Sequence, residues 1–136
     1  MTYADVDDLL QAARSGITRL SARAAAEAVA RGALIVDIRP EWQRRADGEI
    51  AGSVIVERNH LEWRLHPSSD ARLPQAQEGQ EWVVACREGY ASSLATASLV
   101  SLGVPASDLE DGVLGWKAAG LPVVPGPTGV EQVVAG

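Results

Sequence analysis

The sequence predicts an α/β protein in which helices cover both faces of a parallel sheet. Short apolar segments, of which Ala33–Ile38 and Trp82–Ala85 are the clearest, have the character of buried strands. They alternate with segments of helical spacing, and this alternation is typical of parallel sheets. The chain has 136 residues, 46% of them hydrophobic and 22% charged, which suits one ordinary globular core.

The first third of the chain predicts helices and strands in turn. A helix from Ala4 to Arg14, ended by Gly16, places its apolar residues on one side: Val6, Leu9, Leu10 and Ala13. A short strand, Ile17–Leu20, precedes an alanine-rich helix, Ala22–Arg31, which Ser21 can cap. The strand Ala33–Ile38 stops before Pro40, and a short helix follows from Glu41 to Arg45.

The rest of the chain continues this pattern. A turn-rich link, Gly48–Gly52, leads to a strand at Ser53–Val56, a helical segment at Glu57–Leu65 and a polar surface loop at His66–Gln80. After Trp82–Ala85 and its loop come a helix ended by Gly103, a strand within Val104–Leu109 and a helix at Val113–Ala119. We therefore expect an N-terminal helix in residues 1–16, one domain in 17–124 and a flexible tail in 125–136. Three tryptophans are expected to pack in the interior or between helices: Trp42, Trp82 and Trp116.

Charge and composition exclude several classes of function. A net charge of −6 and a pI of about 4.8 argue against nucleic acid or anionic membranes as partners, because phosphate binding needs a basic surface. No apolar run is long enough to span a bilayer, and the acidic N-terminus does not resemble a signal peptide. A single cysteine forms neither an internal disulfide nor a zinc site by itself. We expect a reducing, cytoplasmic setting.

The one cysteine, Cys86, lies at the point that carries most chemical meaning. It directly follows the buried strand Trp82–Ala85, and its loop leads into a helix. Backbone N–H groups and the positive end of the helix dipole face such a position, and they favour a thiolate over a thiol. In parallel sheets, ligands bind beyond the carboxyl ends of the strands, so Cys86 is expected at that edge. The alternative for a lone cysteine is a small buried apolar residue.

Four segments, in the right order, resemble those of a single-domain rhodanese. Leu34–Arg39 is similar to its L-V-D-V-R strand, and Gly48–Ser53 to its G-H-I-P-G-A segment. Cys86–Ser92 resembles the C-R-x-G-x-R-S active loop, and Asp111–Pro122 the G-G-x-x-x-W-x-x-A-G-x-P ending. The resemblance extends from about residue 17 to 123 and implies a central parallel sheet of about five strands.

That resemblance implies sulfur transfer without a cofactor. Cys86 would take a sulfane sulfur from a donor such as thiosulfate or a persulfide, and a thiol or cyanide acceptor would then collect it. Backbone N–H groups would form a cradle for the donor and for the persulfide. The residues of this loop are Arg87, Glu88, Gly89, Tyr90, Ala91 and Ser92. Related phosphatases and arsenate reductases have a loop that is one residue longer, so the length here favours sulfur.

The loop departs from the family pattern in its charges. Ala91 stands where the family usually has arginine, Glu88 adds a negative charge, and Glu49 replaces a usual histidine. Arg87 is the one cation within the loop. We therefore expect weak activity on dianionic thiosulfate, or a persulfide as the natural donor. A regulatory or sulfur-carrying module without catalysis is the alternative function.

Residues outside the loop are candidates for supporting roles. Asp37 and Arg39 lie at a strand end, where pairing that orders the loop is favoured over direct catalysis. Arg58 follows the third strand and is a candidate to replace the charge missing at Ala91, although a solvated helix face is the simpler interpretation. Within the loop, Arg87 is equally consistent with donor binding and with a solvated charge, whereas for Glu88 a solvated charge is favoured over an acid–base role. Tyr90 either walls the pocket or packs on a helix.

Overall fold

The structure is a computed structural model that describes residues 1–129. Its elements run in the order α1 (Val6–Ser15), β1 (Arg19–Leu20), α2 (Ala22–Ala30), β2 (Leu34–Asp37), α3 (Glu41–Asp47), β3 (Glu49–Ile50), β4 (Val54–Ile55), the 3₁₀ turn η1 (Arg58–His60), α4 (Leu61–Leu65), β5 (Trp82–Ala85), α5 (Ala91–Ser101), β6 (Ala106–Leu109), α6 (Gly112–Ala118) and β7 (Val123–Val124). The predicted alternation of strands and helices is confirmed. No helix in this described range is long and apolar enough to cross a membrane.

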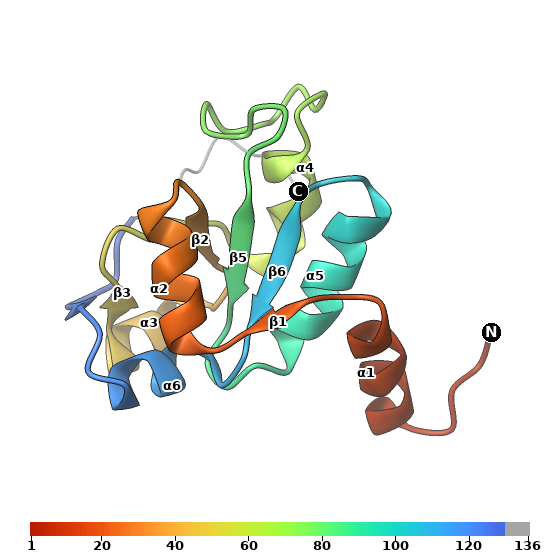
Figure 1. The fold of residues 1–136 in the computed structure, drawn as a ribbon, viewed down its shortest axis with the longest axis horizontal. Coiled ribbons are helices and arrows are strands. Elements are labelled where there is room, and N and C mark those ends of the chain that lie inside the picture. Colours follow the sequence, from red (N-terminus) through yellow and green to blue (C-terminus); the bar gives the residue numbers. More distant parts are fainter. Residues whose placement is uncertain (130–136) are drawn as a thin grey trace.

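Five parallel strands form the central sheet in the order β1-β6-β5-β2-β4. The chain continues outward from β2 to β4 on one side and from β5 to β6 on the other, where β1, the first strand of the chain, forms the edge. Between β2 and β5 the connections diverge, and in open α/β sheets this point is where ligands bind. In Figure 1 the arrowheads of β5 and β6 point to the lower edge, where their loops lead to α5 and α6.

Helices cover both faces of this sheet, as predicted (Figure 1). On one face α4 and α5 contribute Leu61, Leu65 and Leu99 to a buried apolar cluster. On the other face α2 and α6 contribute Ala25, Ala28, Val113 and Trp116 to a second cluster. The central strands β2 and β5 are therefore buried on both sides, which explains their nearly continuous apolar sequences.

The prediction for the tryptophans is confirmed at two positions and wrong at the third. Trp82 and Trp116 are buried, whereas the side chain of Trp42 is 64% exposed. Residues two apart on a helix point to nearly opposite sides, and on α3 it is Arg44 that faces inward. Arg44 can be buried because ion pairs with Glu49 and Glu57 compensate its charge. Helix α3 therefore packs against the domain through a charged side chain, and Trp42 stays on its outer side.

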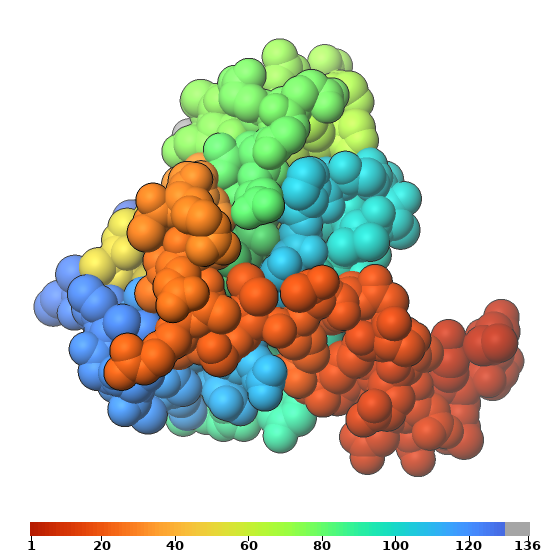
Figure 2. Space-filling model, viewed as in Figure 1, coloured from red at the N-terminus to blue at the C-terminus, as the bar shows by residue number. Residues whose placement is uncertain are grey.

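Helix α1 lies against α5 and forms a lobe at one corner of the molecule (Figures 1 and 2). The predicted apolar side is only partly covered, because Leu10 is buried while Val6 is 70% exposed. The covered side continues one turn later at Arg14, which is half-buried. A polar contact thus replaces the fuller apolar packing that the pattern predicted.

A small second sheet joins the segment predicted as a turn-rich link to the chain that follows α6. Strand β3 pairs with β7 in antiparallel register, Glu49 with Val124 and Ile50 with Val123. The turn-rich link at Gly48–Gly52 therefore contains a strand, and the chain after α6 contains another. Next to them Thr128 donates its backbone N–H to Glu49 and accepts a bond from Arg44. Thr128 thus contacts the domain, residues 130–136 lie outside the described residues, and the flexibility of the tail 125–136 stays a prediction.

Candidate active site

Cys86 leaves the central strand β5 at the carboxyl edge of the sheet and is 7% exposed. The neighbouring register pair, Asp37 with Ala85, places the end of β2 directly beside it. Helix α6 fixes the start of the loop, since the N–H groups of Val113 and Leu114 donate to the carbonyls of Cys86 and Arg87 at 2.9 and 3.2 Å. The predicted position of Cys86 at the ligand edge is therefore present in the fold.

Three polar groups surround the sulfur of Cys86. The backbone N–H groups of Gly89 and Ser92 donate to Sγ at 3.1 and 3.4 Å. The thiol in turn donates to Ser92 Oγ at 3.2 Å, and the same hydroxyl can donate back to an ionised sulfur. The backbone N–H groups of Arg87, Glu88 and Tyr90 have no acceptor in the part of the chain that the structure describes. The loop is thus a cradle of donors around one sulfur atom.

The sulfur opens onto a pocket of about 260 Å³. It is lined by Gln43, Cys86, Arg87, Glu88, Tyr90 and Ala91. Most of these residues belong to the loop itself, and Tyr90, which is 60% exposed, forms one wall. Gln43 comes from α3 and was not singled out by the sequence, because no motif marks a glutamine that reaches the site from another element. The space suits a small donor or a single side chain rather than a bulky ligand.

At the mouth of this pocket, two carboxylates form ion pairs with the cation of the loop. Arg87 donates from Nε to Asp47 at 3.0 Å, and its Nη1 forms an ion pair with Glu88. Asp47, Arg87 and Glu88, the mouth cluster, together carry one positive and two negative charges. Neither Arg87 nor Glu88 is therefore a free solvated charge, and the pairing with Asp47, forty residues away, has no local signal in the sequence.

Asp37 and Arg39 form the buried pair that the sequence favoured. Both side chains are fully buried, and Arg39 Nη2 lies 2.7 Å from Asp37 Oδ2. The same nitrogen donates to the carbonyl of Gly48 at 2.7 Å, which ties the end of β2 to the start of β3. Neither residue lines the pocket at Cys86. The pair orders the backbone next to the site and has no contact with the sulfur.

Arg58 does not supply the charge that is missing at Ala91. It pairs with Glu62, four residues later, at 2.9 Å and does not line the pocket at Cys86. Glu62 also accepts a bond from Ser98 on α5. Burial raises the pKa of Glu62, but the hydrogen bonds from Ser98 and Arg58 outweigh it and hold that pKa below its ordinary value. Arg58 is thus paired on the surface of a helix, in agreement with the simpler interpretation of this residue as part of a solvated helix face.

Two other arginines reach the loop from behind. Arg14 of α1 and Arg19 of β1 both donate to the carbonyl of Gly89, at 2.8 and 3.1 Å. The sequence contains no signal for this contact, because the acceptor is a backbone atom some seventy residues away. Arg19 is paired with Asp108 only because β1 and β6 are neighbours in register.

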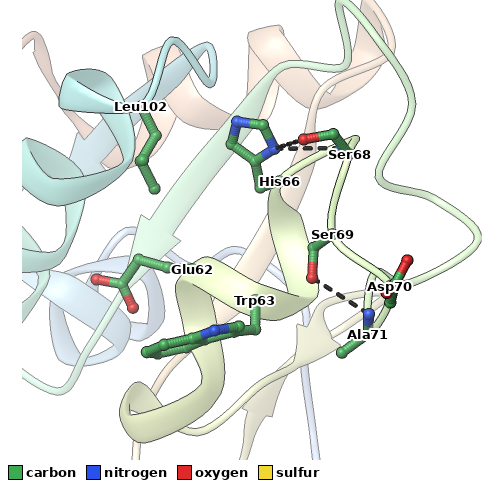
Figure 3. Close-up of a pocket in the computed structure, with 8 residues that line it drawn as sticks. All are labelled: Glu62, Trp63, His66, Ser68, Ser69, Asp70, Ala71 and Leu102. Atoms are coloured by element: carbon green, nitrogen blue, oxygen red, sulfur yellow. Dashed lines mark hydrogen bonds between the residues drawn. The ribbon is translucent and has the colours of Figure 1, made fainter.

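A second and larger cavity of about 580 Å³ lies at the other end of α5. Figure 3 shows Glu62 and Trp63 projecting into it from α4, with Leu102 opposite and His66 hydrogen-bonded to Ser68. Leu102 is eleven residues beyond the start of α5, which corresponds to about 16 Å along the helix axis. This cavity is therefore separate from the pocket at Cys86. In residues 1–129 no group of three or more His, Cys, Asp or Glu side chains is placed to hold a metal ion.

Several solved structures share the fold of this chain. A solved protein of unknown function from Rhodopseudomonas palustris, described as a possible tyrosine phosphatase, is 31% identical with a TM-score of 0.80, covering 90% of this chain and 97% of that one. A rhodanese-related protein from Thermoplasma volcanium is 25% identical with a TM-score of 0.64, covering 79% and 97%. A thiosulfate sulfurtransferase from Pseudomonas aeruginosa shares the fold at 23% identity and a TM-score of 0.64, covering 81% of this chain and 20% of its own.

No curated protein matches the chain. The family model described as a rhodanese-like domain matches residues 19–119, a span that includes the five-stranded sheet, the Cys86 loop and α6. Of the four motifs noted in the sequence, two fall on β2 and on the loop after β5, and the other two contain β3 and α6. By this match and by its fold, the chain belongs to the rhodanese-like domain family.

Proposed function

We propose that this protein is a sulfurtransferase that carries sulfane sulfur as a persulfide on Cys86. The observation that carries the proposal is the cradle, in which Gly89 N–H, Ser92 N–H and Ser92 Oγ surround Sγ within 3.4 Å. Such donors stabilise a sulfur anion, which is both the attacking species and the form in which a persulfide leaves the first step. No cofactor is needed for this chemistry.

The reaction consists of two exchanges that balance without an oxidant. In the first, the Cys86 thiolate attacks the outer sulfur of a donor persulfide, the donor's S–S bond breaks, and the donor leaves as a thiolate that takes up a proton. Cys86 then carries the extra sulfur as a persulfide anion. In the second, an acceptor thiolate attacks that outer sulfur, which returns Cys86 to a thiolate and forms the acceptor persulfide. Cyanide as acceptor would leave as thiocyanate.

The charges of the mouth cluster favour a persulfide donor over dianionic thiosulfate. A dianion such as thiosulfate would meet Arg87 already paired with Asp47 and Glu88, and these three side chains together carry a net charge of −1. The next cation, Lys117, is exposed and donates to the carbonyl of Asp47 at 3.0 Å. A persulfide group carries at most one negative charge where thiosulfate carries two, so it is repelled less. We infer that a persulfide is the better donor. A thiolate mechanism also requires a reducing compartment, and we propose the cytoplasm.

Two other functions have specific observations in their favour. Ala91 and the neutralised Arg87 suit a binding or sulfur-carrier module that does not turn over. The similarity to the Rhodopseudomonas protein suggests phosphatase activity as an alternative. A phosphate dianion, however, needs a free cation in the loop, and Arg87 is paired with two carboxylates. Sulfur transfer is the function that the geometry supports best.

Intact mass spectrometry tests the proposal. The protein is exposed to glutathione persulfide and, separately, to thiosulfate, and Cys86→Ser is the control that lacks the nucleophile. We expect a gain of one sulfur atom with the persulfide, removed by reductant and absent in the variant. A folded protein that gains no sulfur from either donor, yet alkylates at Cys86, would favour the binding module. Hydrolysis of p-nitrophenyl phosphate that depends on Cys86 would favour the phosphatase.

Neutralising the mouth cluster tests the donor class. Glu88→Gln removes one negative charge beside the pocket, whereas Glu78→Gln removes one from the exposed 66–80 loop at the opposite edge. We expect Glu88→Gln to raise the thiosulfate rate by about threefold to tenfold and to change the persulfide rate less, because a dianion gains more from a lost repulsion. Equal effects of the two variants would refute this account of donor choice.

A further inference from the structure

Gly89 is held from both sides by opposite ends of its backbone. Its N–H donates to Cys86 Sγ at 3.1 Å, while its carbonyl accepts from Arg14 Nη2 at 2.8 Å and Arg19 Nη2 at 3.1 Å. Its φ of +96° is in the range that favours glycine, and an added Cβ would lie 3.2 Å from Arg19 Nη2. The residue that presents an amide to the sulfur is thus the residue that the two arginines fix.

The arginines belong to a connected and largely buried set of polar groups. Arg14 Nε donates to Ser93 Oγ at 3.0 Å, and Ser93 Oγ lies 2.6 Å from Asp108 Oδ2. Arg19 Nε lies 2.8 Å from the same carboxylate oxygen, and the Asp108 side chain is fully buried. Arg14, Arg19 and Asp108, the rear cluster, carry two positive charges and one negative charge. This excess of positive charge lies directly behind the cradle.

We propose that Arg14 and Arg19 are positioning residues that hold the Cys86 cradle and supply, from behind it, the positive charge that the loop lacks at Ala91. This role rests on the proposed function of Cys86. The arginines orient the Gly89 N–H toward Sγ, and by polarising the Gly89 carbonyl they strengthen the next amide, that of Tyr90, as a donor. Their net positive charge also attracts the negative charge that the sulfur carries during the transfer.

Helix α1 is then part of the active unit rather than an appendage. Arg14 lies outside residues 19–119, the span that the family model matches. Its guanidinium also lies 5.9 Å from the centroid of the Tyr90 ring, over a wall of the pocket. One side chain of α1 therefore contacts the loop carbonyl, the first turn of α5 through Ser93, and the pocket wall.

The simpler account is that these contacts only attach α1 to the domain. The two accounts differ in what they predict for Cys86 itself. Attachment alone would lower the stability of the fold on substitution and leave the reactivity of the sulfur unchanged. Positioning would also change the pH dependence of that reactivity. The other charged groups around the loop are Arg87, Glu88 and Asp47, together with Asp111 and Lys117 of the adjoining α6 segment.

The test measures alkylation of Cys86 by iodoacetamide as a function of pH, with thermal unfolding in parallel. The variants are Arg14→Gln, Arg14→Lys, which retains the charge, and Arg23→Gln, an exposed arginine of α2, as control. We expect Arg14→Gln to slow alkylation about threefold to tenfold at neutral pH and little at alkaline pH, where every thiol is ionised. Arg14→Lys should recover most of the rate, and Arg23→Gln should match the unchanged protein.

Arg19→Gln tests the second arginine, and it leaves Asp108 buried without its ion pair. Where that variant does not fold, Arg19→Gln with Asp108→Asn removes both charges together. Wild-type alkylation at neutral pH in Arg14→Gln and in the folded Arg19 variant would overturn the proposal. Alkylation needs no sulfur donor, so a chain that never forms a persulfide yet responds to Arg14→Gln refutes the proposed function and leaves the positioning role standing.

Discussion

Replacing Gly112 by alanine should disable the Cys86 loop by direct collision. Gly112 begins α6 at a φ of +61°, and an added Cβ would lie 2.4 Å from the carbonyl oxygen of Arg87 and 2.5 Å from that of Cys86. Unstrained contacts of this kind are about 3.4 Å or longer, so the two backbones must separate by about 1 Å. Both colliding atoms are backbone, and no side-chain rotation relieves the contact.

The size of the effect follows from that displacement. The same backbone atoms accept hydrogen bonds from Val113 and Leu114, so separation weakens the contacts that fix the start of the loop. A shift of about 1 Å in a catalytic group costs on the order of 100-fold in rate. A non-glycine residue in the left-handed region also costs about 1–2 kcal/mol of stability. Gly112→Ala should therefore lose about 100-fold in sulfur transfer and a small part of its stability.

Gly120→Ala is the matched control for this experiment. Gly120 has a similar φ of +77°, but an added Cβ there would meet nothing within 4 Å. It should show the same backbone cost in thermal unfolding and retain the full rate of persulfide transfer from glutathione persulfide. The reasoning is refuted if Gly112→Ala is folded and transfers sulfur within about twofold of the rate of Gly120→Ala, since the close approach of α6 would then not set the geometry of the loop.

Two further predictions concern the charged groups around the site. Burial raises the pKa of Glu49, but hydrogen bonds from Thr128 and Arg44 outweigh it and lower the pKa below its ordinary value, so its stabilisation is present above the ordinary pKa and is lost as the pH falls through the folded one. Thr128→Ala should therefore move acid unfolding, followed by circular dichroism, to higher pH; an unchanged midpoint would contradict this. Arg39→Met leaves Asp37 buried without its partner and should cost about 3–5 kcal/mol in urea unfolding, and a cost below about 1 kcal/mol would contradict the pairing.

The sequence was informative where a local pattern decides the structure. The parallel strands at Leu34–Asp37 and Trp82–Ala85 are buried on both faces, so their apolar runs are visible without knowledge of the fold. Because β5 is central, the residue after it had to lie at the ligand edge, and this gave the position of Cys86. The sheet of about five strands came from the family resemblance and is confirmed.

What the sequence could not predict depends on pairs of residues far apart in the chain. Strand β3 has two residues and exists because β7, more than seventy residues later, lies beside it. Asp47 meets Arg87 only because α3 follows β2, the neighbour of β5. The sequence places Arg14 in the last turn of a predicted helix. Its acceptor is a backbone carbonyl, and because every residue has one, no residue type indicates it.

The two clusters on either side of the Cys86 loop have opposite net charges. The mouth cluster, Asp47, Arg87 and Glu88, has one negative charge in excess, and the rear cluster has one positive charge in excess. A donor in solution approaches through the mouth and meets the negative side first. The sulfur of Cys86 accepts a hydrogen bond from the N–H of Gly89, and the rear cluster donates to the carbonyl of the same glycine.

An arginine at position 91 would attract an anionic donor and favour an ionised sulfur at the same time. With Ala91 these two effects are separated, because the charge that acts on the sulfur comes from behind the loop while the entrance stays negative. In the proposed mechanism, this separation would allow a thiolate and a preference against dianions to coexist in one small pocket. It also explains why the arginine missing from the loop motif does not by itself imply that the site is inactive.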